Sequence, residues 1–147
     1  MDVSIHRPRP GGDRGAAVVE AALILLALFV FLLGIMEAGR FINTEQVLTN
    51  AAREGARFAV APLSGTNTLP TTAEIEDRVD IFLASANLSD GVTVTVDSAF
   101  TVDHGDFTTT YTRVTVSRPY QVLTIPMFSG LEITMEGEAL MRNETSS

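Results

Sequence analysis

The chain has 147 residues, a formal net charge of −8 at pH 7 and no cysteine. The acidic balance argues against nucleic-acid binding, which needs a basic face that displaces counterions from phosphates. The absence of cysteine excludes disulfides and thiolate metal sites, so any folded part depends on its own apolar core. The length leaves room for one small domain beside a membrane segment.

Residues 1–15 form a leader rich in proline and glycine, without an apolar run to bury, so we predict that it is disordered. Its three arginines outnumber its two aspartates, which gives a net charge of +1. The positive-inside rule then places the leader in the cytoplasm and the chain after residue 36 outside. A secretory signal peptide is the alternative, but Glu37 and Arg40 crowd the position where its cleavage site would lie.

Residues 16–36 are apolar except for Glu20. As an α-helix these residues extend about 31 Å, which matches the ~30 Å hydrocarbon core of a bilayer. An acidic side chain opposes insertion by at most roughly 3 kcal/mol, whereas ten strongly apolar residues each favour it by ~0.3–0.6 kcal/mol. We therefore predict a transmembrane helix, in which Glu20 either lies at headgroup level or has a function.

Residues 37–61 continue the helical pattern, with apolar and polar residues on different sides. The apolar side comprises Phe41, Leu48, Ala52, Ala56 and Ala59. Because no proline precedes Pro62, we expect one unbroken helix from near Ala16 to near Ala61, with Gly34 and Gly39 as its weak points.

Two features of this amphipathic segment each have two interpretations. The small residues Ala51, Gly55 and Ala59 form a line that could pack against the chain's own head or against a neighbouring helix. Arg53, Glu54 and Arg57 could be a solvated helix face with ordinary ion pairs, or they could recognise a partner. Because an exposed ion pair contributes only ~0.2–1 kcal/mol, any importance of these three would lie in recognition.

Residues 62–147 have the patterns of a small α+β head. Thr71 and Glu74 have the spacing of a capping box, and the apolar spacing after them predicts a helix that ends near Asn87. Alternation with a period of two predicts strands around residues 92–96, 109–117 and 131–141. We expect the second strand to continue toward residues 120–125 after a break at Pro119. Residues 103–107 should form the hairpin turn between the first two strands.

The predicted fold class is therefore α+β, in which a long N-terminal transmembrane and stalk helix precedes one further helix and a three- to four-stranded antiparallel sheet. The predicted organisation is a leader at 1–15, a transmembrane helix at 16–36, an amphipathic continuation at 37–61 and an extracytoplasmic head at 62–147. A single pass with a cytoplasmic N-terminus follows from the arginine asymmetry.

Residues for catalysis are scarce, because the chain has two histidines, no cysteine, no nucleophile elbow and no phosphate loop. His104 with Asp103 and Asp106 is the one candidate metal cluster, but acids in a hairpin are usually turn formers. We therefore expect no enzyme activity, cofactor, metal or small-molecule substrate.

Three stretches resemble one family. The basic leader that ends in Gly15, with Glu20 the fifth residue after it, resembles the processing site of type IV pilin-like proteins. Residues 34–41 (GIMEAGRF), 49–61 (TNAAREGARFAVA) and 138–144 (EALMRNE) resemble the TadE family of the tight-adherence (Tad/Flp) pilus system.

This resemblance implies that a prepilin peptidase cleaves between Gly15 and Ala16 and that Glu20 helps the mature chain to dock with other pilin-like subunits. The expected function is that of a minor pilin or pseudopilin that assists assembly of an adhesive pilus at the bacterial inner membrane. Its partners would be the peptidase, related subunits and the inner-membrane assembly platform. The alternative is an uncleaved single-pass protein whose head binds an envelope component.

Overall fold

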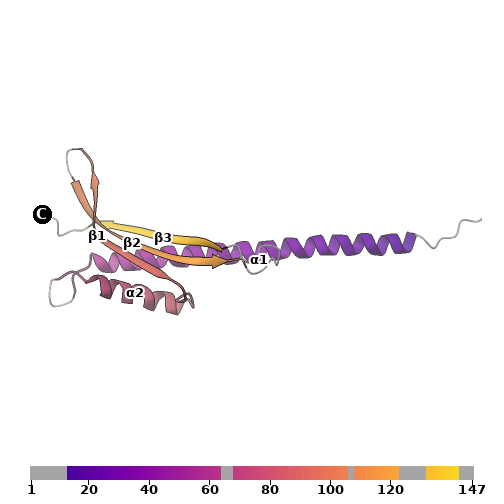
Figure 1. Cartoon of the computed structure of the whole chain (residues 1–147), viewed down its shortest axis with the longest axis horizontal. Coiled ribbons are helices and arrows are strands. Elements are labelled where there is room, and N and C mark those ends of the chain that lie inside the picture. Colours follow the sequence, from indigo (N-terminus) through magenta and orange to yellow (C-terminus); the bar gives the residue numbers. More distant parts are fainter. Residues whose placement is uncertain (1–12, 64–67, 106–107, 123–131, 143–147) are drawn as a thin grey trace, which may run out of the picture.

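The computed structural model describes residues 13–63, 68–105, 108–122 and 132–142. It contains a long helix that carries a compact head at one end (Figure 1). The elements are α1 (Asp13–Ala59), α2 (Thr72–Ser85), β1 (Thr93–Asp103), β2 (Thr108–Gln121) and β3 (Glu132–Arg142). The predicted α+β layout is confirmed.

Helix α1 is continuous over 47 residues, as the absence of proline predicted. It passes through Gly34 and Gly39 without a break in the helix. It begins at Asp13, three residues before the expected start, so residues 13–15 are helical although we assigned them to the disordered leader. Residues 1–12 of the leader lie outside the described residues.

The two halves of α1 have opposite surroundings. In the first half no described part of the head covers the apolar side chains, and Leu23, Phe29 and Met36 are 54–62% exposed. In the second half Leu48, Ala52 and Ala56 are fully buried, as the amphipathic pattern predicted. The head therefore covers only the half of α1 that follows the apolar run.

Helix α2 begins at the predicted capping box. The Thr71 hydroxyl accepts a hydrogen bond from the Glu74 backbone N–H (3.4 Å), and the Glu74 carboxylate accepts one from the Thr71 backbone N–H (2.8 Å). These two bonds satisfy donors that have no partner within the helix. Ile75, Val79 and Leu83 form the buried face of α2.

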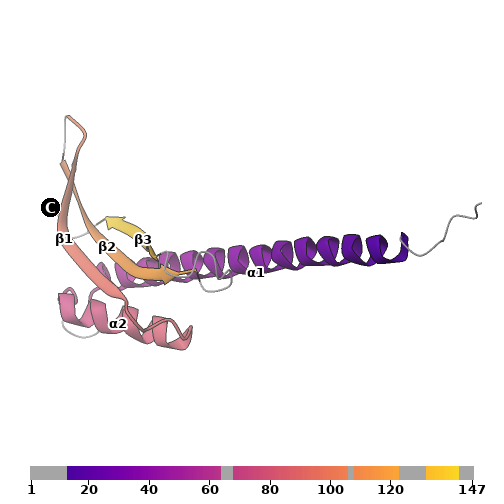
Figure 2. The same cartoon turned by 45° about the vertical axis from the view of Figure 1, so that its right-hand side comes forward.

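The three described strands form an antiparallel sheet in the order β1-β2-β3. Helices α1 and α2 cover one face of it, with α1 against β2 and β3 and α2 against β1 (Figures 1 and 2). The β1–β2 hairpin reverses between Asp103, where β1 ends, and Thr108, where β2 begins, as predicted. Residues 106 and 107 lie outside the described residues. The far end of the hairpin bends away from the helices, beyond an irregularity between Asp97 and Phe100.

The break that we predicted at Pro119 is wrong, because β2 runs without interruption from Thr108 to Gln121. Strand β1 begins at Thr93, which pairs with Ser117, so at Pro119 only β3 lies beside β2. A proline, which lacks an N–H, is tolerated at such a local edge. The predicted continuation to residue 125 falls on residues 123–131, which lie outside the described residues.

Two glycines bring the elements into close contact. A Cβ added at Gly55 would lie 2.6 Å from Val79 Cγ2 of α2 and 3.2 Å from Val114 Cγ1 of β2. A Cβ added at Gly137 would lie 2.5 Å from the Thr49 backbone nitrogen of α1. The line of small residues on α1 therefore packs against the chain's own head, the first of the two interpretations above.

Candidate functional site

The bare half of α1 carries the first candidate residues. Among the described residues, one helix, at 15–59, is long and apolar enough to cross a membrane, with a mean hydropathy of 2.9 in its most apolar stretch. Gly15 and Glu20 both lie on it, five residues apart, which is about 7.5 Å along a helix axis. Glu20 is exposed and has no hydrogen bond or ion pair within the described part of the chain. Both residues are thus open to a partner beside the helix.

The peptide bond between Gly15 and Ala16 lies in the first turn of α1. A peptidase that acts here must unwind this turn, because cleavage needs an extended substrate. The N–H groups of a first helical turn have no carbonyl partner four residues earlier, so helix ends open at little cost. The helical start at Asp13 therefore leaves the predicted cleavage site accessible after local fraying.

The second group, Arg53, Glu54 and Arg57, separates into two parts. Glu54 accepts hydrogen bonds from Arg78 Nε (3.1 Å) and Nη2 (2.6 Å), so it joins α1 to α2. Arg53 and Arg57 are exposed and have no ion pair with any described residue. They border a groove of about 560 Å³ whose other wall includes Leu140 and Met141 of β3. Ion pairing thus explains Glu54, while the two arginines remain available to a partner.

A third group, which the sequence analysis did not assign, lies where α1 enters the head. Glu37 is only 8% exposed, and its carboxylate accepts hydrogen bonds from the Tyr120 hydroxyl (2.6 Å) and from Arg40 Nη1 (3.0 Å). The Arg40 guanidinium lies 5.8 Å from the centre of the Tyr120 ring, and Phe41 meets this ring edge-on at 5.4 Å. Burial raises the pKa of Tyr120, and the hydrogen bond to Glu37 raises it further.

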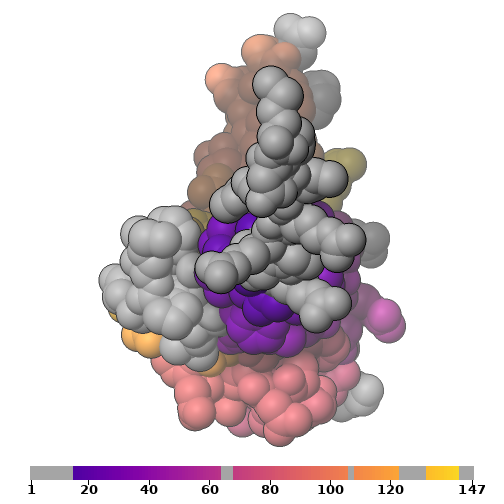
Figure 3. Space-filling model, turned by 90° about the vertical axis from the view of Figure 1, so that its right-hand side faces the viewer, coloured from indigo at the N-terminus to yellow at the C-terminus, as the bar shows by residue number. Residues whose placement is uncertain are grey.

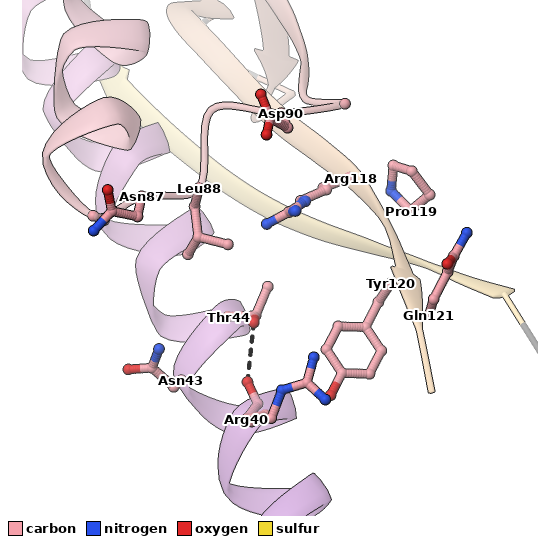
Figure 4. Close-up of a pocket in the computed structure, with 12 residues that line it drawn as sticks. Arg40, Asn43, Thr44, Asn87, Leu88, Asp90, Arg118, Pro119, Tyr120 and Gln121 are labelled. Carbon is pink, nitrogen blue, oxygen red and sulfur yellow. Dashed lines mark hydrogen bonds between the residues drawn. The ribbon is translucent and has the colours of Figure 1, made fainter. Parts of the chain in front are cut away.

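Arg40 and Tyr120, which these contacts hold in place, both line a groove with a volume of about 620 Å³. Figure 4 shows Arg40 beside the Tyr120 ring, and Arg118 projecting from β2 into the space between β2 and α1. The other wall is the connection between α2 and β1. The polar residues of the lining are Arg40, Asn43, Thr44, Asn87, Asp90, Arg118, Tyr120 and Gln121.

Only weak signals of this group are present in the sequence. Glu37 directly follows the apolar run, where its charge argues against a signal-peptide cleavage site and indicates no partner. Tyr120 follows a proline in an alternating strand, 83 residues further along the chain. No motif joins such distant positions, so the pairing could not be deduced before the packing of β2 on α1 was known.

The predicted turn at residues 103–107 carries no metal cluster in its described part. Asp103 Oδ1 accepts a hydrogen bond from the backbone N–H of Gly105, whose φ is +86°, as expected for turn chemistry. Asp106 lies outside the described residues. Within the described ranges, no three histidine or acidic side chains are grouped so as to hold a metal ion.

The view along α1 from its N-terminal end shows α2 on one side of the helix and the β1–β2 hairpin on the opposite side (Figure 3). The second half of α1 contributes Leu48, Ala52 and Ala56 to the core of the head. Its residues connect the bare apolar half to the sheet.

Comparison with known proteins finds a family match that lies within α1. The sequence model of the family described as TadE-like protein matches residues 15–57, which lie entirely within α1 and include Gly15, Glu20, Glu37, Arg53 and Arg57. No curated protein and no solved structure matches the chain. The resemblance to the TadE family inferred from the sequence is therefore confirmed over residues 15–57.

Proposed function

We propose that this chain is a minor pilin or pseudopilin that assists assembly of a Tad/Flp-type adhesive pilus. The observation that carries the proposal is the apolar half of α1, which the head leaves bare and which belongs to the TadE-like match at residues 15–57. A helix of this kind can insert in a membrane and later pack against equivalent helices of other subunits. The role is structural and needs no catalysis, cofactor or metal.

Glu20 provides the specific contact in this proposal. Cleavage between Gly15 and Ala16 would create a positive amino terminus four residues from Glu20, or about 6 Å along the helix axis. A carboxylate and an ammonium group are each unfavourable in lipid, so the amine of one subunit and Glu20 of its neighbour stabilise one another when they pair. Cleavage and docking are then two steps of one process.

The partners follow from this scheme. A prepilin peptidase removes residues 1–15 at the cytoplasmic face, and the inner-membrane assembly platform gathers the mature chain with related pilin-like subunits. The head lies outside the cytoplasmic membrane of a bacterium, and the N-terminus lies inside. Arg53 and Arg57 offer the head a second contact with an acidic partner surface, because no acidic residue of the described chain pairs with them.

The alternative is an uncleaved single-pass anchor whose head binds an envelope component. It requires no unwinding of the first turn of α1, in which the Gly15–Ala16 bond lies. The core of the head does not use the leader either, since it begins at Leu48, with Phe41 and Val47 packed against it. This alternative assigns Glu20 no contact with other subunits.

The test compares Glu20→Ala with the wild-type chain in cells that contain the other pilus components. Both proteins should insert equally well, because alanine is more apolar than glutamate. After cross-linking in the membrane, the variant should recover several-fold less of the other pilin-like subunits, because the neighbour's amine loses its counter-charge.

Two matched variants give the test its specificity. Glu20→Asp keeps the carboxylate and should retain part of the association. Glu45→Ala removes an exposed carboxylate from the part of the same helix that follows the apolar run, and it should leave the yield of partners unchanged. Recovery of partners by Glu20→Ala at the wild-type level would support the plain anchor instead.

A further inference from the structure

We propose that the groove formed by α1, the end of β2 and the α2–β1 connection binds the phosphate of a phospholipid headgroup, which holds the head against the bilayer that anchors it. The inference rests on membrane insertion of residues 16–36 and is independent of the role in a pilus.

The position of the groove on α1 fits a headgroup. The headgroup layer is about 5–7 Å thick on each side of the hydrocarbon core. Arg40 follows Met36 by four residues, or about 6 Å along the helix axis. Arg40 therefore lies at the level of the lipid phosphates. Thr44, one turn further on, also lines the groove. The groove therefore extends outward from the membrane surface.

The charges of the groove fit an oxyanion. Arg40 and Arg118 both line it, and the Arg40 side chain is 43% exposed. Arg118 has no hydrogen bond or ion pair with any described residue, and its guanidinium projects into the groove (Figure 4). Guanidinium groups bind phosphate through paired N–H donors, which makes arginine the preferred side chain for this ligand.

The remaining polar side chains suit the rest of a headgroup. Asn43, Asn87 and Gln121 provide amides that both donate and accept hydrogen bonds. Asp90 provides a carboxylate that can accept from a hydroxyl or an amine of the headgroup. This combination favours a phosphate ester with a polar substituent over a bare anion, for which Asp90 would be repulsive.

The buried carboxylate of Glu37 orients two residues that line the groove, Arg40 and Tyr120. By accepting from both Arg40 and Tyr120 it fixes the guanidinium beside the aromatic ring. Tyrosine with an apolar ring and a polar tip is the residue type that concentrates at membrane interfaces. A donor that is already oriented loses less conformational entropy when the ligand binds.

The test uses the full chain in a maltoside detergent, which contains no phosphate. Native mass spectrometry would count bound phosphatidylglycerol, and a digalactosyl lipid with the same acyl chains would serve as the phosphate-free comparison. We expect phosphatidylglycerol to be retained more than the galactolipid, and Arg118→Gln to lower its retention about tenfold, since a charge-assisted hydrogen bond is lost. Arg118→Lys, which keeps the charge but not the fork, should give a smaller loss.

Arg142→Gln is the matched control, because it removes an exposed arginine at the other end of the sheet, where β3 ends. It should retain phosphatidylglycerol as the wild type does. Equal retention of the two lipids, or equal losses in the variants of Arg118 and Arg142, would overturn the proposal. Soluble glycerol phosphate tests the source of the ligand: if it binds as well as the lipid at equal concentration, the groove recognises a free phosphate and the lipid assignment is wrong.

Discussion

A buried carboxylate fixes the place where the membrane helix becomes part of the head. Glu37 accepts hydrogen bonds from a neighbour on α1 and from Tyr120 of β2, so it joins the helix to the sheet. A buried acceptor that loses its donor destabilises a fold by ~1–3 kcal/mol. The contact between Glu37 and Tyr120 therefore stabilises the fold, and it also holds Tyr120 in the lining of the groove.

The pKa of Tyr120 gives this contact a pH dependence. Burial and Glu37 raise the pKa of Tyr120 above its ordinary value of 10.0, so the folded chain holds the phenolic proton more tightly than the unfolded chain does. The stabilisation is complete below pH 10 and is lost as the pH rises through the folded-state pKa. Denaturant unfolding of the full chain in detergent, repeated between about pH 8 and 11, should show this fall.

Tyr120→Phe removes the phenol and should abolish most of this fall, while it lowers stability at neutral pH because Glu37 loses a donor. Tyr111→Phe is the control, since Tyr111 lies at the other end of β2 and has no contact with Glu37. It should keep the alkaline fall. A curve for Tyr120→Phe that parallels the wild type above pH 10 would contradict this account of the Glu37 contact.

Gly137 is the position where the head tolerates a side chain least. A Cβ there would lie 2.5 Å from the Thr49 backbone nitrogen and 2.7 Å from the Leu48 carbonyl oxygen, and backbone atoms cannot rotate aside. Gly137→Ala must separate β3 from α1, so we expect a loss of about 1–3 kcal/mol or more in the free energy of unfolding.

Two other glycine-to-alanine substitutions provide comparisons for the unfolding free energy of Gly137→Ala. Gly55→Ala meets the side chains of Val79 and Val114, which can adjust, so its loss should be smaller. Gly39→Ala meets no atom within 4 Å and should stabilise the helix by up to ~1 kcal/mol. If Gly137→Ala were as stable as Gly39→Ala, the close approach of β3 to α1 would be wrong.

At the scale of elements, α2 could be predicted with its start because its determinants are local. Thr71 and Glu74 satisfy one another's backbone N–H groups, and the apolar residues recur at helical spacing. Pro119 was mispredicted because its effect depends on a neighbour that the local sequence does not reveal. A proline breaks a strand that is paired on both sides, whereas here β1 has no residue opposite it.

The capping box makes a direct prediction for α2. Thr71→Ala should destabilise the head by about 0.5–2 kcal/mol, because the Glu74 N–H loses its acceptor. Hydrogen exchange should speed up first in the opening turn of α2. Thr72→Ala is the control: it deletes the same hydroxyl from an exposed first-turn position and should have little effect. Equal acceleration in both variants would show that the cap contributes nothing.

The hydrogen bonds of the cap also lower the pKa of Glu74, chiefly through the Thr71 backbone N–H. Because the folded-state pKa lies below its ordinary value of 4.5, the stabilisation is present above pH 4.5 and is lost as the pH falls through the folded-state pKa. Thr71→Ala keeps this N–H but removes the hydroxyl that also donates to the Glu74 carboxylate (2.8 Å), so the difference between the wild type and Thr71→Ala should become somewhat smaller at low pH.

For the whole molecule, the division of α1 into a bare half and a packed half could be predicted from hydrophobic patterning. Residues 16–36 are apolar on every side, whereas residues 37–59 have one apolar face. A single sheet can bury that one face, but it cannot cover a helix that is apolar all round. The groove could not be predicted, because it is formed by segments from α1, β2 and the connection after α2 that meet only in the fold.

The bare half of α1 is also the part of the molecule from which the proposed function derives. A soluble head does not need it, and the described head does not cover it. Its two distinctive residues, Gly15 and Glu20, stabilise nothing within the described structure. The roles of Gly15 and Glu20 therefore have to be tested in cells, by cleavage of the chain and by its association with other subunits.

The most direct test is the intact mass of the chain isolated from cells with an active prepilin peptidase. We predict a mature protein that begins at Ala16, and a Gly15→Asp variant that retains residues 1–15 because a larger, charged residue blocks the cut. A wild-type chain that retains residues 1–15 under these conditions would contradict the pilin-like assignment and leave the plain membrane anchor.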